Sequence, residues 1–217
     1  MDGFGMANEK KKTLIQELEQ KGYLQSQSVK KAFKKISREQ FIPEQLREHA
    51  YVDMPLFIGN GQTISAPHMI AIMIEELELK PGLKVLEIGT GSGYHAALVS
   101  QIIGPEGHVY SIERFEKLAE QAKINLENAN IENVTVKQGD GSLGLSNYQP
   151  YDRIFVTCAA PSIPQPLKDQ LDDPGILLIP VGKTFCQLVK YKKENGMESS
   201  KNLMGCSFVP LVGEFGH

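Results

Sequence analysis

A glycine-rich turn constrains the fold of this chain more than any other feature of its sequence. Residues 85–94 (VLEIGTGSGY) begin with an apolar run and continue with glycine at every second position. Glycine adopts positive φ readily and has no Cβ, so a ligand can approach the backbone of such a turn closely. The segment therefore predicts a strand, a ligand-binding turn and a helix, in that order.

The residues after this turn alternate between strand and helix patterns. Strands are expected at 84–88, 108–113, 134–138, 153–157, 175–181, 186–192 and 203–210, and helices at 94–103, 115–129 and 164–171. This alternation is typical of an α/β fold, here a doubly wound, mostly parallel sheet of seven strands (Rossmann-like). The last two strands are expected to form an antiparallel C-terminal hairpin around a polar turn at 193–202.

The first part of the chain has helical periodicity instead, with helices expected at 9–22, 28–38 and 43–49. We therefore expect an N-terminal helical cap and active-site loop at residues 1–80. The main α/β domain is expected at 81–217, and the two parts are expected to form one structural unit.

The overall charge and the cysteines exclude several classes of protein. Lys and Arg number 23 against 26 Asp and Glu, a net charge of −3, so there is no general basic field for a nucleic-acid backbone. The three cysteines form no CxxC pair, which argues against a zinc site or a disulfide framework. Residues 1–8 lack the features of a signal peptide, and no apolar run reaches the roughly 20 residues that span a bilayer. A soluble cytoplasmic protein without metal, nucleic-acid or membrane partner is expected, and a monomer is the favoured oligomeric state.

Two acidic residues follow strands in the α/β part. Glu113 ends the second predicted strand, where a carboxylate can accept hydrogen bonds from both hydroxyls of a ribose, a feature shared with dinucleotide-binding enzymes. Asp140 follows the third strand between two glycines and can accept a hydrogen bond from the amino group of adenine. The dinucleotide fingerprint GxGxxG is not matched, because Tyr94 occupies its sixth position. The pattern thus favours an adenosine ligand without a pyrophosphate.

From Leu83 to about Val181 these residues resemble the class I S-adenosylmethionine-dependent methyltransferases. The resemblance implies S-adenosyl-L-methionine as cofactor and S-adenosyl-L-homocysteine as its product. In this part of the chain it implies cofactor contacts from Glu87, Gly89, Thr90, Gly91, Glu113, Arg114, Asp140 and Gly141.

A second informative segment, residues 61–69 (GQTISAPHM), precedes the α/β domain. Its residue types predict a helix N-terminus with Thr63 or Ser65 as the capping residue. The segment also resembles the signature loop of the protein-L-isoaspartate O-methyltransferases, as do 51–56 (YVDMPL), 157–161 (TCAAP) and 208–211 (FVPL). Similarity to this family therefore extends over most of the chain.

That resemblance implies roles for the residues of the loop. Ser65 would be the catalytic residue. The cofactor would be contacted by Gln62, Thr63, Ile64 and Ser65, and the substrate by Ile64, Ser65 and Ala66. Two positions depart from some family members: Ile70 and Val212 replace a histidine and a threonine. No cofactor contact is expected from either side chain.

The reaction implied is methyl transfer to the free carboxylate of L-isoaspartyl residues in damaged proteins and peptides, and the ester then closes to a succinimide. A carboxylic acid with a pKa of about 4 is already ionised at neutral pH, so the enzyme needs no general base. It must only align the carboxylate and remove its water. His68 and His95 are therefore expected to be structural.

Two alternative functions remain open at this point. A small-molecule carboxyl or hydroxyl methyltransferase is disfavoured by the scarcity of aromatic residues for an enclosed pocket, 7% with no Trp. An RNA methyltransferase is disfavoured because no Asp/Asn-Pro-Pro-aromatic motif follows the fourth predicted strand.

Overall fold

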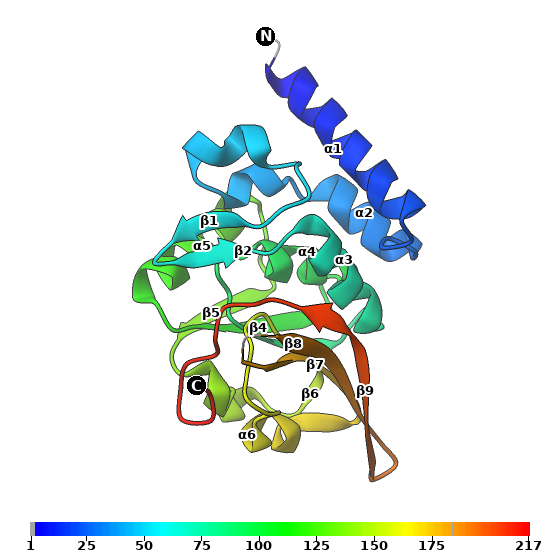
Figure 1. The fold of residues 1–217 in the computed structure, drawn as a ribbon, viewed down its shortest axis with the longest axis vertical. Coiled ribbons are helices and arrows are strands. Elements are labelled where there is room, and N and C mark those ends of the chain that lie inside the picture. The colour runs from blue at the N-terminus through cyan, green and yellow to red at the C-terminus, as the bar shows by residue number, and fades with distance from the viewer. Residues whose placement is uncertain (1–2, 184) are drawn as a thin grey trace.

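A seven-stranded sheet forms the centre of the computed structural model, which describes residues 3–183 and 185–217 (Figure 1). Its strands are β3 (Lys84–Ile88), β4 (His108–Glu113), β5 (Val134–Gln138), β6 (Tyr151–Val156), β7 (Leu171–Gly182), β8 (Cys186–Glu194) and β9 (Met197–Cys206). Their order is β5-β4-β3-β6-β7-β8-β9, with β3 to β7 parallel and β8 and β9 antiparallel. The predicted fold class is confirmed.

Successive residues of the central strands enter two different hydrophobic cores. Phe155 packs into one core, whereas its neighbours Ile154 and Val156 pack into the other. Leu178 and Leu177 divide in the same way on β7. Since side chains alternate across a strand, both faces of the sheet are buried, as expected for a parallel sheet between covering layers.

The helices cover these two faces unequally. They are α1 (Gly3–Gln20), α2 (Gln27–Lys35), α3 (Pro67–Glu76), α4 (Tyr94–Ile103), α5 (Glu116–Asn128) and α6 (Gln165–Asp169), with 3₁₀ helices at Arg38–Phe41, Glu44–His49, Gly141–Leu143 and Ser146–Tyr148. The apolar residues of α1 to α5 join one core, and among the described helices α6, with its neighbouring turns, covers the other face. Where a helix was predicted at 43–49, the structure has the 3₁₀ helix Glu44–His49. No helix in the described part of the chain has the length and apolar character needed to cross a membrane.

Two tight hairpins correct the prediction from sequence. Strands β1 (Leu56–Gly59) and β2 (Gln62–Ile64) form a separate two-stranded sheet in a segment for which only a loop had been expected. The polar turn expected at 193–202 is instead mostly strand, and only residues 195–196 connect β8 to β9. Each hairpin turns on an Asn-Gly pair with positive φ at both residues, the geometry of a type I′ turn.

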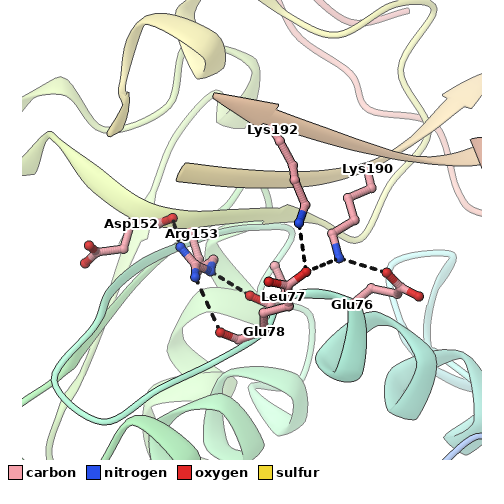
Figure 2. Close-up of polar contacts among 7 residues, drawn as sticks. All are labelled: Glu76, Leu77, Glu78, Asp152, Arg153, Lys190 and Lys192. Atoms are coloured by element: carbon pink, nitrogen blue, oxygen red, sulfur yellow. Dashed lines mark hydrogen bonds and ion pairs between the residues drawn. The ribbon is translucent and has the colours of Figure 1, made fainter. Parts of the chain in front are cut away.

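The C-terminal end of α3 is attached to the sheet by a polar network (Figure 2). Arg153 donates from Nε to the Leu77 carbonyl at 2.6 Å, which satisfies a backbone oxygen left free where the helix ends. The Lys190 ammonium, whose side chain is only 9% exposed, lies 2.9 Å from a Glu76 oxygen and 2.8 Å from a Glu78 oxygen. Through these contacts β6 and β8 hold one end of α3.

We expect Lys190→Met to destabilise the protein by about 1–3 kcal/mol at pH 7. Removing one partner of a buried ion pair costs about 3–5 kcal/mol, but water reaches both Glu76 and Glu78 and reduces the loss. Hydrogen bonding to Lys190 is the main cause that lowers the pKa of Glu78 to about 2. Because the folded state lowers this pKa, the stabilisation is present above about pH 4.5 and disappears as the pH falls toward 2.

Urea unfolding of the wild type and variant at pH 7 and pH 3 measures this difference. The gap in unfolding free energy should be smaller at pH 3. Lys192→Met is the matched control, because among the described residues Lys192 forms an ion pair with Glu78 alone and its side chain is 40% exposed. An equal loss in both variants would contradict the importance of the buried contact.

Candidate functional site

The glycine turn lies between β3 and α4, at the carboxyl ends of the parallel strands. Gly89, Gly91 and Gly93 all have positive φ, at 91°, 55° and 87°. A Cβ on Gly89 would overlap the Oγ1 atom of Thr157, whose hydroxyl donates to the Gly89 carbonyl at 2.6 Å. Glycine is therefore required here both by conformation and by space.

Both carboxylate oxygens of Glu113 accept hydrogen bonds from backbone N–H groups. Its Oε2 accepts from the Gly91 N–H at 2.9 Å, and its Oε1 accepts from the Phe115 N–H at 3.0 Å. Each carboxylate oxygen has two acceptor sites, so both can accept a further hydrogen bond from a ligand. Glu113 lines a cavity, the Glu113 cavity, together with Gln62, Thr63, Ile88, Gly89, Gly91, Ile112, Arg114, Gly141, Thr157, Cys158 and residues 209–212.

Glu87 lies at the bottom of a second, smaller cavity. Burial is the main cause that raises the pKa of its carboxyl to about 8. Its Oε2 accepts from the Ser111 hydroxyl at 2.5 Å, while Oε1 is buried with no partner among the described residues. Such a group is costly to leave unsatisfied, which points to a ligand donor at Oε1. This Glu87 cavity is also lined by Thr63, Ile64, Ser65, Ile70, Gly89, Thr90, Gly91, Ser92, Tyr94, His95 and Thr157.

Both carboxylate oxygens of Asp140 accept hydrogen bonds from the protein itself. Its Oδ1 accepts from the N–H and hydroxyl of Ser142, and its Oδ2 accepts from the Glu214 N–H at 2.8 Å. Partial burial opposes ionisation, but these hydrogen bonds lower its pKa overall. Asp140 is not among the residues that line the cavities described here, whereas its neighbour Gly141 is. In this structure Asp140 holds the C-terminal segment beside the Glu113 cavity.

An open groove of about 510 Å³ meets the Glu87 cavity at Thr63, Ser65 and Thr157. We call it the His68 groove. Residues before and at the start of α3 line one side, and residues from the end of β9 onward line the other. Its remaining lining residues are Pro55, Ala66, His68, Met69, Met204, Gly205, Cys206, Ser207, Phe208 and Val209. Ser65 therefore lies where the Glu87 cavity and this groove join.

The predicted helix cap is wrong in its residue. Ala66 occupies the N-cap position of α3, and neither Thr63 nor Ser65 donates or accepts a capping hydrogen bond. Asp53, which is 15 residues earlier in the chain, caps this helix end instead. Its Oδ1 accepts a hydrogen bond from the His68 N–H at 2.9 Å. The side chains of residues 63 and 65 are thereby left to face the cavities.

Several lining residues were missed from sequence. Ile70 and Val212, from which no contact was expected, line the Glu87 and Glu113 cavities respectively. His95, expected to be structural, is buried and also lines the Glu87 cavity, and burial lowers its pKa to about 3. Cys158 lines the Glu113 cavity, and burial raises the pKa of its thiol, which disfavours a nucleophilic thiolate. Of these four residues, only Cys158 lies in one of the segments that resemble the family, TCAAP at 157–161.

The described residues contain no cluster of three or more His, Cys, Asp or Glu that could hold a metal ion. The arrangement consists instead of a turn that admits a ligand to the backbone, two carboxylates with unused acceptor capacity, and a serine at the mouth of a groove. It can hold an adenosine-type ligand beside a second, extended molecule.

Comparison with known proteins gives a consistent result. A family model described as protein-L-isoaspartate(D-aspartate) O-methyltransferase matches residues 8–216. The protein-L-isoaspartate O-methyltransferase of Methanothermobacter thermautotrophicus is 49% identical over 211 residues, which cover 96% of this chain and 97% of that protein.

Two solved structures are similar over nearly the whole chain. A protein-L-isoaspartate O-methyltransferase has a TM-score of 0.85 at 32% identity, covering 95% of this chain and 67% of that chain. A Plasmodium falciparum structure assigned to the same methyltransferases, in complex with S-adenosyl-L-homocysteine, has a TM-score of 0.82 at 26% identity and covers 93% of this chain and 97% of that chain.

Proposed function

This chain belongs to the protein-L-isoaspartate O-methyltransferase family, and we propose here how its own residues carry out that reaction. The enzyme transfers a methyl group from S-adenosyl-L-methionine to the free carboxylate of L-isoaspartyl residues in damaged proteins and peptides. The resulting ester starts repair, because the following backbone nitrogen displaces methanol and closes a succinimide. The observation that supports our assignment of roles most directly is the position of Ser65 between the Glu87 cavity and the His68 groove.

The two cavities fit the two ends of the cofactor. Glu113 would accept hydrogen bonds from the ribose hydroxyls. Each of its carboxylate oxygens has one acceptor site that is not used by the backbone. Gly141, Ile112 and Arg114 would surround the adenine, and Asp140 would fix this wall through its contacts with Ser142 and the C-terminal segment. The unpartnered Glu87 Oε1 would accept from the ammonium group of the methionine part.

The loop before α3 would contact both reactants. Gln62 and Thr63 line the Glu113 cavity, and Thr63, Ile64 and Ser65 line the Glu87 cavity. Ser65 and Ala66 also line the groove, where the isoaspartyl segment would lie. Thr90 and Gly91 would complete the cofactor site from the turn.

The cofactor supplies an electrophilic methyl group, and the protein supplies position. The substrate carboxylate is ionised at neutral pH, so no residue has to remove a proton from it. Ser65 donates a hydrogen bond that orients one carboxylate oxygen, while Ile64 and Ala66 exclude water from it. An open groove suits an extended segment of another protein, and no observation favours a small molecule or RNA as methyl acceptor.

Transfer of labelled methyl to an isoaspartyl peptide and to its normal aspartyl twin tests this function. The two peptides have the same composition and charge, and they differ only in which carboxylate continues the backbone. We expect labelling of the isoaspartyl peptide alone. Equal labelling of both, or of neither, would contradict the substrate while leaving the cofactor assignment intact.

We further propose that residues 1–80 act as a cap and active-site loop on the methyltransferase part at 81–217, in one unit. Apolar residues of α1 and α2 share a core with the α/β strands, which supports a single structural unit. We also propose that the enzyme works in the cytoplasm as a monomer, without nucleic-acid or membrane partners. The net charge of −3 supports the absence of a nucleic-acid partner. Light scattering across a concentration series tests the oligomeric state.

A further inference from the structure

An aspartate–histidine pair lies on the wall of the substrate groove and has no role in the reaction as described above. The Oδ1 atom of Asp53 lies 2.9 Å from Nδ1 of His68 and also 2.9 Å from the backbone nitrogen of His68. The His68 side chain is 32% exposed and lines the groove together with Ser65. The pair is therefore in reach of a substrate bound there.

A buried cation, Arg38, lies near Asp53. The Arg38 side chain is almost completely buried, and one of its nitrogens donates to the carbonyl of Met54 at 3.4 Å. Burial lowers the pKa of Arg38 to about 10, and the nearby charge of Asp53 opposes this decrease. Arg38 is thus protonated at neutral pH and attracts the Asp53 carboxylate. Because Oδ1 of Asp53 contacts both the backbone nitrogen and the ring of His68, it gives the ring a defined orientation.

The contact with Asp53 also selects the tautomer of the ring. A carboxylate can only accept, so Nδ1 of His68 must carry the hydrogen that lies between them. In the neutral ring this leaves Nε2 as an acceptor, and Nε2 has no partner among the described residues. The His68 ring also lies 5.7 Å from the ring of Tyr23, which limits its rotation. The groove thus contains an oriented hydrogen-bond acceptor.

Most kinds of hydrogen-bond donor in a substrate segment belong to side chains and therefore depend on its sequence. Backbone N–H groups are the donors that every peptide has, whatever its side chains. We propose that His68, oriented by Asp53, is a substrate-binding residue. Its Nε2 accepts a hydrogen bond from a backbone N–H beside the isoaspartyl residue. This proposal rests on the proposed function, and it assigns to His68 a direct contact that a purely structural histidine would not make.

Peptides with a single N-methylated backbone amide test the proposal, because N-methylation removes one N–H at a time. Among isoaspartyl peptides methylated at each neighbouring amide in turn, we expect one to lose about 10- to 100-fold in kcat/KM with the wild type. The His68→Phe variant should methylate the unmodified peptide with a kcat/KM reduced by a similar factor, mainly through a higher KM. The N-methyl group that impairs the wild type should cause no further loss in this variant.

Two further variants keep the test decisive. Asp53→Asn retains an oxygen that can cap α3 but no longer fixes the ring tautomer, so it should also reduce the effect of the N-methyl group. If His68→Phe does not fold, Asp53→Asn provides the answer by itself. His49→Phe is the matched control, since His49 is exposed on the 3₁₀ helix Glu44–His49. Affinity for S-adenosyl-L-homocysteine should be unchanged in all three folded variants.

The possible outcomes separate this proposal from the function on which it rests. A wild type that methylates no isoaspartyl peptide would overturn the function itself. A wild type that methylates the parent peptide but tolerates every N-methyl group would overturn only the contact with His68. The same holds if the loss caused by N-methylation is as large in His68→Phe and Asp53→Asn as in the wild type.

Discussion

Gly89→Ala is expected to reduce the affinity for S-adenosyl-L-homocysteine by at least about 100-fold and to destabilise the protein by about 2–5 kcal/mol. A side chain at a positive φ such as the 91° of Gly89 costs about 1–2 kcal/mol. The new Cβ would also overlap the Thr157 hydroxyl, and overpacking of this kind costs about 1–3 kcal/mol. The turn must then shift, and a displacement of about 1 Å in a binding site commonly costs 100-fold in function.

Gly82→Ala is the control for the effect of conformation alone. Gly82 has a similar φ of 84°, but a Cβ there would have no atom within 4 Å. We expect this variant to lose about 1–2 kcal/mol of stability and to keep its affinity for the cofactor product. Calorimetric titration and urea unfolding measure the two quantities. Equal affinities for Gly89→Ala and Gly82→Ala would mean that the turn does not contact the cofactor.

Ser65→Ala is expected to lower kcat by about 10- to 1,000-fold, with little change in the affinity for S-adenosyl-L-homocysteine. The hydroxyl would orient the substrate carboxylate and stabilise the geometry of transfer, so its loss acts mainly on the chemical step. Loss of one hydrogen-bond donor leaves the cavities and their carboxylates unchanged. Single-turnover methylation of an isoaspartyl peptide measures the effect without interference from product release.

Ser207→Ala is a useful companion, because Ser207 also lines the groove but does not line the Glu87 cavity. A small effect is expected for this variant. If Ser65→Ala turned over at the wild-type rate, Ser65 would not be a catalytic residue. If both variants lost activity equally, the hydroxyls of the groove would act on substrate binding in general.

The central α/β elements were predictable because their side chains follow simple periods. Strand β3 and helix α4 have the predicted bounds, since buried apolar runs and a glycine turn leave little choice of structure. The β1–β2 hairpin was missed because its strands have only four and three residues, too few to show a period. Strand β9 was placed too late in the chain because its first six residues are exposed and five of them are polar. An edge strand of this kind looks like a loop in the sequence.

The site was predictable where it is local in the chain and less so where the fold assembles it. Glu87 and Glu113 lie near the carboxyl ends of adjacent parallel strands, so their proximity follows from the topology. The contact between Asp53 and His68 spans 15 residues and depends on the unpredicted hairpin between them. The tail residue Glu214 reaches Asp140 across 74 residues, a distance at which no local pattern gives a signal.

The lining of the Glu113 cavity brings together residues 62–63, the glycine turn and residues 209–212. A ribosome makes these segments in that order, from the N-terminal side onward. The growing chain can pair β3, β4 and β6 well before the last wall of the cavity exists. Cofactor binding would therefore begin only after residue 212 has left the ribosome, which stalled chains of increasing length would reveal. Acquisition of the methyl donor would then be a late event in biosynthesis, later than formation of the sheet that supports it.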